Sequence, residues 1–289
     1  MTLITSPSNP RISKLQTLHS ARGRKKHGLF LMEGPHLLET LLNAQLWPHE
    51  VYYQPTLLQR TAEGRALLER LLHTPALTES QLIEVSDRVI EALGETQTSQ
   101  GVVSVLTLDA LDPAVLQQKR QPGARPCLLI LDDLADPGNM GTILRTALAA
   151  DVERILLTPH CVDYYSPKVV RSAAGAHVAL PVETNVDWET MSTRIASHCG
   201  DHVQVLLAEA GSTHMYYEQD LTHPFALIIG NEAHGPSPEG HRLATLPISI
   251  PLANAVESLN AAMATGIILY ETVRQNAMHV STSSSKEHH

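Results

Sequence analysis

The chain has 289 residues, which favours two domains that are each large enough to bury a core. Its three cysteines share no short spacing, so the sequence predicts neither a disulfide framework nor a zinc knuckle, and we expect a reducing, cytoplasmic compartment. It contains no apolar run of 18 residues that would span a bilayer and no signal-peptide core. Aromatic residues make up only 4%, which suits an α/β protein with an aliphatic core.

The charge is distributed unevenly along the chain. A formal net charge of −9 by itself argues against binding to RNA. Residues 1–107, however, carry ten basic and ten acidic side chains, so the excess of negative charge lies entirely in residues 108–289. The first thirty residues hold no acidic side chain and six basic ones: Arg11, Lys14, Arg22, Arg24, Lys25 and Lys26. Salt screens charges beyond roughly 10 Å, so such a patch can bind phosphates on an acidic protein.

Residues 1–107 alternate between strand and helix patterns. Apolar spacing predicts a short helix over residues 9–20, followed by an exposed basic turn over residues 21–28. Further strands are expected at residues 29–34, 51–54, 82–86 and 101–108, and further helices at residues 36–44, 62–73 and 87–93. This order predicts a small α/β domain.

The second half reads as a larger α/β domain. Residues 108–125 lack periodicity and are interpreted as a linker, residues 126–278 as the domain, and residues 279–289 as a disordered tail. Expected strands are residues 127–133, 154–158, 176–182, 203–210, 224–230 and 246–252, and expected helices are residues 141–150, 168–174, 188–198 and 259–276. Such alternation predicts a mostly parallel sheet, whose ligands bind beyond the carboxyl ends of its strands.

Three polar stretches follow apolar strands in this second part. They are residues 132–147, 227–235 and 248–271, and their strand ends could converge on one site. Glycines at 230 and 235 would allow a close approach of backbone to a ligand, and Ile229 and Ile250 could line an apolar slot. The alternative is that these residues are ordinary core positions that end in turns. No GxGxxG follows the first strand of this part, so an ordinary Rossmann site is not indicated.

At these residues the chain resembles the SpoU, or TrmH-like, branch of the SPOUT methyltransferases, which transfer a methyl group from S-adenosylmethionine to a ribose 2′-hydroxyl of RNA. Three motifs carry the resemblance in the family's order, over roughly 130 residues. The first is matched by Asn139, Gly141, Arg145 and Ala147, the second by Gly230, Asn231, Glu232 and Gly235, and the third by Ile250, Pro251, Ser258, Leu259, Asn260 and Glu271. Residues 164–176 also look like the family.

The first part resembles the ribosomal-protein-like RNA-binding domain that many of these enzymes carry. The family's FxxEG is matched by Phe30, Glu33 and Gly34, and its later QG by Gln100 and Gly101. The resemblance implies a trefoil knot in the C-terminal domain and a homodimer. It demands no metal.

The resemblance also implies roles for individual residues. The implied catalytic residues are Asn139, Arg145, Glu232, Ser258 and Asn260. The implied cofactor-binding residues are Ile229, Gly230, Asn231, Gly235, Ile250, Leu252, Ser258 and Leu259. The expected RNA-binding residues are the six basic ones named above together with Lys168 and Arg171.

Each of these side chains also has a plain structural interpretation. Asn139 could cap a helix, Arg145 could be a solvated arginine, and Ser258 or Asn260 could cap the last helix, with Ser258 the first choice. Glu232 could be a surface carboxylate, or it could hold Arg145 or Asn139 in place. Asn254 stands where the third motif usually has Gly, but Asn tolerates a positive φ better than most residues.

The resemblance therefore predicts an S-adenosylmethionine-dependent RNA 2′-O-ribose methyltransferase. We expect 23S ribosomal RNA as the substrate, because the extra N-terminal domain is commoner among the family's rRNA enzymes, and a resistance-type enzyme fits as well. The alternatives are a tRNA 2′-O-methyltransferase and a non-catalytic RNA-binding protein that keeps the fold.

Overall fold

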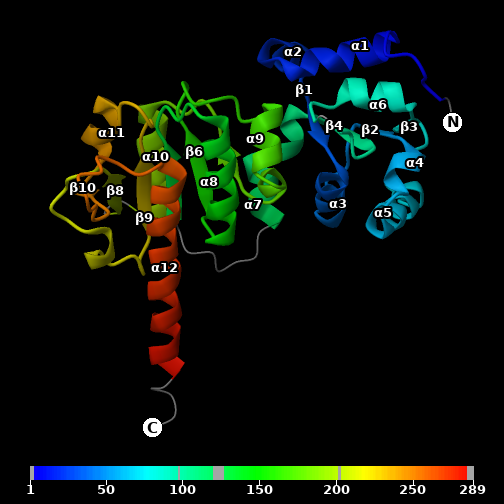
Figure 1. The fold of residues 1–289 in the computed structure, drawn as a ribbon. Helices are drawn as coiled ribbons and strands as arrows, with labels where there is room; N and C mark the ends of the chain where they lie inside the picture. The colour runs from blue at the N-terminus through cyan, green and yellow to red at the C-terminus, as the bar shows by residue number, and fades with distance from the viewer. Residues whose placement is uncertain (1–2, 97, 120–126, 201–202, 285–289) are drawn as a thin grey trace. The chain divides into compact units, whose positions relative to one another are not determined.

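The computed structural model describes residues 3–96, 98–119, 127–200 and 203–284 (Figure 1). Internal contacts divide the chain into two units. The first comprises Met1–Asp112 with Tyr165–Ala179, and the second comprises Pro113–Tyr164 with Leu180–His289. Residues 165–179 are thus separated in sequence from the rest of the unit to which they belong.

A mixed sheet of four strands forms the centre of the first unit. The strands are β1 (Leu29–Glu33), β2 (Glu50–Tyr53), β3 (Leu82–Glu84) and β4 (Val102–Thr107), in the order β1-β4-β2-β3. β4 is antiparallel to both β1 and β2, whereas β2 and β3 are parallel. Neighbouring residues of β2 pack into different apolar clusters, Tyr52 into one and Val51 and Tyr53 into the other. This follows from the two-residue period of a strand, and it leaves both faces of the sheet buried.

Helices and short 3₁₀ turns complete this unit. They are α1 (Pro10–Gln16), η1 (Thr17–His19), α2 (Ala21–His27), α3 (Pro35–Asn43), α4 (Pro55–Leu58), α5 (Ala62–Leu72), α6 (Asp87–Leu93), η2 (Leu108–Leu111), α9 (Pro167–Ser172) and η3 (Ala176–Val178). The basic segment expected to be a turn is the helix α2, so that expectation was wrong. The Ser20 side chain accepts a hydrogen bond from Gly23 N, and Gly28 ends the helix at φ +65°. These two caps make the segment helical without an apolar stripe.

The second unit contains a six-stranded sheet in which every described pair is parallel. Its strands are β5 (Cys127–Leu131), β6 (Arg154–Leu157), β7 (Val182–Glu183), β8 (Gln204–Ala208), β9 (Phe225–Ile229) and β10 (Leu246–Ile248), in the order β10-β8-β9-β5-β6-β7. β5 and β9 are buried along their whole length. Continuous apolar runs are typical of parallel strands that are covered on both faces, which explains why the sequence revealed them.

The helices of this unit are α7 (Pro113–Lys119), α8 (Pro137–Ala149), α10 (Trp188–Cys199), α11 (Pro238–Leu243) and α12 (Ala261–Ser284), with the 3₁₀ turn η4 (Tyr216–Glu218). α8 and α12 run side by side (Figure 1). A Cβ added at Gly266 of α12 would lie 3.7 Å from Thr146 of α8, which is an ordinary contact distance. On α12 the side chains of Met263, Tyr270 and Met278 are each more than half exposed.

Several local expectations differ from the structure. The expected strand over residues 176–182 begins with the turn η3, and only its last residue belongs to β7. The expected linker is helical at η2 and α7, while residues 120–126 lie outside the described part of the chain. The expected disordered tail is helical as far as Ser284, and residues 285–289 lie outside the described part. The short helices α4 and α11 were missed because each has too few residues to show a period.

No helix among the described residues is both long and apolar enough to cross a membrane.

Candidate active site

A pocket of about 410 Å³ lies at the carboxyl ends of three neighbouring strands in the second unit. The pairing register aligns the ends of β5, β9, β8 and β10, since Leu131 and Ala208 both pair with Ile229 and Ile248 pairs with Ala208. The loops after β8, β9 and β10 form the wall together with one face of α12 and with His241 of α11. Two of the three polar stretches singled out in the sequence therefore meet at this pocket.

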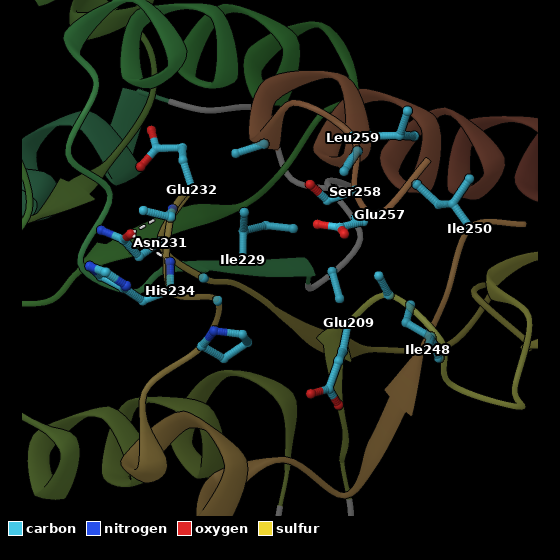
Figure 2. Close-up of a pocket in the computed structure, with 18 of the residues that line it drawn as sticks. Glu209, Ile229, Asn231, Glu232, His234, Ile248, Ile250, Glu257, Ser258 and Leu259 are labelled. Atoms are coloured by element: carbon cyan, nitrogen blue, oxygen red, sulfur yellow. Dashed lines mark hydrogen bonds between the residues drawn. The ribbon is translucent and has the colours of Figure 1, made fainter. Parts of the chain in front are cut away.

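All residues expected to bind the cofactor line this pocket, several of which are labelled in Figure 2. They are Ile229, Gly230, Asn231, Gly235, Ile250, Leu252, Ser258 and Leu259. Of the expected catalytic residues, Glu232 and Ser258 also line it, whereas Asn139, Arg145 and Asn260 do not. Four titratable residues of the wall were missed: Glu209, His234, His241 and Glu257. His234 and Glu257 fell within motif stretches, but no short spacing distinguished them as site residues.

The loop after β9 is held tightly closed at the pocket edge. Asn231 N donates to Gly235 O at 3.0 Å, and Gly235 N donates to Asn231 O at 2.9 Å. The Asn231 side chain accepts from Ala233 N at 2.8 Å and donates through Nδ2 to Asp133 O at 2.7 Å. The side chain thereby ties this loop to the loop after β5. Gly235 has φ +71°, a conformation that favours glycine.

Glu232 connects this loop to the start of α8. Its carboxylate accepts hydrogen bonds from Ala135 N and Asp136 N, both at 3.1 Å, and from Asn139 Nδ2 at 2.9 Å. Partial burial opposes the charged form, but these donors outweigh it and lower the pKa of Glu232 below its ordinary value. Glu232 is therefore charged at neutral pH and connects the two loops. Of the two side chains expected as its partner, it binds Asn139 and not Arg145.

Asn139 continues the connection to α12. Its Oδ1 accepts from Asn260 Nδ2 at 2.9 Å. Asn260 Oδ1 in turn accepts from Ala262 N at 3.0 Å and Met263 N at 3.2 Å, so Asn260 is the residue that caps α12. A chain of hydrogen bonds thus joins Asn139 to two segments that lie 93 and 121 positions further along the chain.

Two expected helix caps were assigned to the wrong residues. Asp136, and not Asn139, caps α8, since Asp136 Oδ1 accepts from Asn139 N at 2.8 Å. Ser258 does not cap α12, which begins three residues later, at Ala261. Both errors have one cause: several adjacent polar residues can each cap a helix, and sequence alone does not choose among them.

The loop before α12 has an uncommon backbone conformation. Asn254 has φ +58°, which confirms the expectation that Asn replaces Gly at a left-handed position. Ala255 follows with φ +56°. A non-glycine residue in this region is uncommon and strained, so two in succession fix a sharp turn just before Glu257 and Ser258.

Arg145 lies on α8 and is exposed. Within the described residues its guanidinium makes no hydrogen bond or ion pair, and it does not contribute to the pocket wall. Glu271, also part of the third motif, instead forms an ion pair with Arg274 at 2.6 Å and accepts from Gln275 at 2.9 Å. Glu271 therefore has a structural role on α12, whereas Arg145 is free to meet another molecule.

The basic residues of the first unit differ in their availability. Lys14, Arg22, Lys25, Lys26 and Lys168 are exposed. Arg24 is only 4% exposed, and its guanidinium donates to Leu18 O at 2.7 Å and His19 O at 3.0 Å, so it closes the turn η1 instead of facing solvent.

Two further basic residues already have acidic partners. Arg11 lies 2.8 Å from Glu50 and over the ring of Tyr52, at 5.7 Å. Arg171 lies 3.3 Å from Glu95.

No cluster of three potential metal ligands occurs in the part of the chain that the structure describes.

Comparison with known proteins places these features in a family. Residues 126–270 match the family model of the SpoU rRNA Methylase family, and residues 9–104 match that of the MRM3-like substrate binding domain. An uncharacterized tRNA/rRNA methyltransferase of Synechocystis is 36% identical over 94% of this chain and 93% of its own length. The 23S rRNA (guanosine(2553)-2′-O)-methyltransferase of Bacillus subtilis is 28% identical over 93% of this chain and 98% of its own.

A solved structure is similar over the same extent. It is the AdoMet-bound rRNA methyltransferase from Sinorhizobium meliloti, with a TM-score of 0.77, 27% identity, and coverage of 94% of this chain and 97% of that one.

Gly230 is the position at which the pocket loop is most sensitive to a side chain. A Cβ there would lie 2.3 Å from Pro236 N and 2.5 Å from Gly235 C, too close for backbone atoms that cannot rotate away. We expect Gly230→Ala to deform the loop and to lower the free energy of unfolding by about 1–3 kcal/mol, the usual cost of overpacking. Thermal unfolding measures this change.

Gly266→Ala is the matched control, because its new Cβ would make only the 3.7 Å contact with Thr146. Since alanine is favoured over glycine in a helix, this variant is expected to be as stable as the wild type or more stable, by up to about 1 kcal/mol. A Gly230→Ala protein that unfolds at the wild-type temperature would show that the loop is not constrained in this way.

Proposed function

The chain belongs to the SpoU rRNA methylase family, and from this premise we propose that it methylates a ribose 2′-hydroxyl of 23S ribosomal RNA with S-adenosylmethionine as methyl donor. The observation that carries this proposal is the pocket, which residues of the second and third family motifs line at the ends of parallel strands. Ligands of open parallel sheets bind at this edge. The relative from Bacillus subtilis, named for 2′-O-methylation of 23S rRNA, covers nearly the same extent of chain.

The pocket fits the cofactor chemically. Ile229, Ile250 and Leu252 offer apolar walls for an adenine, and the closed turn of residues 230–236 brings backbone polar groups to the pocket edge. When bound, S-adenosylmethionine supplies a methyl group attached to a positively charged sulfur. The leaving group would be a neutral thioether, so the reaction needs no general acid. The chain must then orient the ribose 2′-oxygen, which forms the new bond to carbon, while the C–S electron pair stays on sulfur and the hydroxyl proton passes to solvent.

The charged and amide side chains near the pocket are assigned different parts of binding and orienting the RNA. The hydrogen bonds that Asn139 donates to Glu232 and that Asn260 donates to Asn139 hold the amides in one orientation, so they can position the target nucleotide. Arg145 carries a permanent charge and a planar fork that suits a phosphate. We assign it to the RNA phosphate next to the reacting ribose, where it lowers the cost of forming the alkoxide.

RNA contact is assigned to the exposed basic residues of the first unit. Lys14, Arg22, Lys25 and Lys26 lie on or beside α1 and α2, with no acidic residue in this part of the sequence, and Lys168 lies on α9. Arg11 and Arg171 would have to leave Glu50 and Glu95 to bind a phosphate. The match to a substrate-binding domain over residues 9–104 supports this assignment.

The proposal also includes a homodimer, a trefoil knot around residues 248–271 and a cytoplasmic location. The exposed Met263, Tyr270 and Met278 give α12 an apolar face of the kind that subunits cover. A dimer also explains how Arg145, which does not line the pocket of its own chain, can serve a site. Light scattering that gives 31.6 kDa for the chain at micromolar concentration would contradict the dimer.

The decisive experiment maps 2′-O-methyl groups in the RNA of cells with and without this gene. One nucleotide of 23S rRNA is expected to lose its methyl group. A change confined to tRNA would favour the tRNA alternative, and no change in any RNA, together with no binding of S-adenosylmethionine, would favour a non-catalytic RNA-binding protein.

Substitution of Arg145 tests its role in catalysis. We expect Arg145→Ala and Arg145→Lys to slow methyl transfer by at least about a hundredfold, because lysine keeps the charge but not the planar fork. Calorimetry is expected to show unchanged cofactor binding, since Arg145 does not line the pocket. Single-turnover rates on a substrate RNA are the measurement, and near-normal transfer by Arg145→Ala would remove this residue from the mechanism.

Neutralising the basic surface tests the RNA assignment. Replacing Arg22, Lys25 and Lys26 by Ala is expected to weaken RNA binding for all sequences and to reduce its salt dependence by a slope of about 0.7–0.9 per lost phosphate contact. Cofactor affinity is expected to stay unchanged. Arg24→Ala is the contrasting variant: because Arg24 is buried, we expect it to lower thermal stability and to leave the salt slope unaltered. An unchanged RNA affinity of the triple variant would show that α2 does not contact RNA.

A further inference from the structure

The pocket wall carries an unbalanced set of charges. Three carboxylates line it, from Glu209, Glu232 and Glu257, and so do the imidazoles of His234 and His241. No lysine or arginine is among the described residues of the wall. At neutral pH the pocket is therefore negative, and it favours a cationic ligand over a neutral one of the same shape.

Two of these carboxylates already have partners in the protein. Glu232 accepts the three hydrogen bonds from Ala135, Asp136 and Asn139. Glu209 lies 3.7 Å from His241 Nε2, which partly offsets its charge whenever the imidazole is protonated. The charge of Glu232 is thus engaged by the chain itself, whereas Glu209 has one partner at a longer distance.

Glu257 differs from both. Within the described residues it makes no hydrogen bond and no ion pair, and Figure 2 shows its side chain among the pocket residues near Ile229 and Ser258. Its position is determined by the turn at Asn254 and Ala255, which both have positive φ, and by the capping residue Asn260 that follows. A strained turn and a helix cap thus hold an unpaired carboxylate at the pocket.

We infer that Glu257 is the residue by which the pocket favours the cationic methyl donor over the neutral product. This inference rests on the proposed cofactor site. S-adenosylmethionine carries a positive sulfonium, whereas S-adenosylhomocysteine has lost the methyl group and that charge. An unpaired carboxylate on the wall attracts the sulfonium of the donor and has no such charge to attract in the product, so it strengthens binding before the reaction and not afterwards.

The test compares three ligands by calorimetry on the full chain and on Glu257→Gln, which removes the charge but keeps the size. The ligands are S-adenosylmethionine, S-adenosylhomocysteine and sinefungin, whose amine is a cation in place of the methyl sulfonium. We expect the variant to bind both cations about two- to fivefold more weakly, the scale of one solvent-exposed charge pair, with unchanged affinity for S-adenosylhomocysteine. The wild-type preference for the cations is expected to shrink as salt is raised, and the variant's much less so.

Two further variants make the result specific. Glu239→Gln removes one negative charge from α11 outside the pocket wall, where Glu239 is paired with Arg242, and it is expected to leave all three affinities unchanged. Glu209→Gln removes a carboxylate from the wall itself. If the preference for the cations changed in Glu209→Gln and not in Glu257→Gln, the inference would be overturned in favour of Glu209.

The remaining outcomes separate this inference from the proposed function. Unchanged ratios in Glu257→Gln with normal binding of all ligands would reject the role of Glu257 and leave the cofactor site standing. If wild-type protein bound neither S-adenosylmethionine nor S-adenosylhomocysteine, the proposed function would fail, and the inference with it. An equal loss of affinity for all three ligands would show that Glu257 maintains the loop conformation and does not discriminate between charged and neutral ligands.

Discussion

The carboxylate of Glu232 is the interaction on which the geometry of the site depends. It joins the loop after β9 to the backbone that leads into α8, and through Asn139 it reaches the cap of α12. The three bonds to Glu232 have a charged acceptor, so each is stronger than a neutral bond between exposed groups. The carboxylate also lies close to the amino end of a helix, where the helix dipole stabilises a negative charge. Without it, two backbone amides and one side-chain amide would lose their common partner.

This arrangement combines structural and chemical roles in the same residues. Asn260 caps a helix and orients Asn139, and Asn231 closes one loop while binding another. A substitution at any of them changes loop geometry together with whatever contact the residue makes to a substrate, so its effect on rate has no single cause. Arg145 and Glu257 are different, because among the described residues neither has a partner within the chain. Their substitution changes a charge without breaking an internal bond.

The net charge of the chain is reconciled with RNA as substrate by its distribution. The excess of acidic residues lies in the second half of the sequence, and three of them line the pocket. The exposed lysines and arginines of α1 and α2 lie in the first unit, whose sequence is neutral as a whole. A polyanion and a cationic cofactor need opposite fields, and screening by salt over about 10 Å allows one molecule to provide both.

The sequence by itself determined the class of fold, the family and the motif residues that line the pocket. Continuous apolar runs revealed β5 and β9, because buried parallel strands need apolar residues on both faces. The second and third motifs identified pocket residues because those positions depend on residue type, such as the glycine at 230, where a Cβ would lie 2.3 Å from Pro236 N. Short helices, the helical segment of basic residues, and the choice of Asp136 and Asn260 as caps were not predictable from periodicity.

Only the tertiary structure decided which polar groups are partners. Arg24 and Lys25 are neighbours with similar charge, yet one is buried against backbone carbonyls and the other is exposed. Glu209, Glu232 and Glu257 are indistinguishable as residue types, but the first faces an imidazole, the second binds three N–H groups and the third is unpaired among the described residues. Hydrogen bonds and ion pairs depend on distances of about 3–4 Å between segments far apart in the chain, and a sequence pattern sets only the local order of residues.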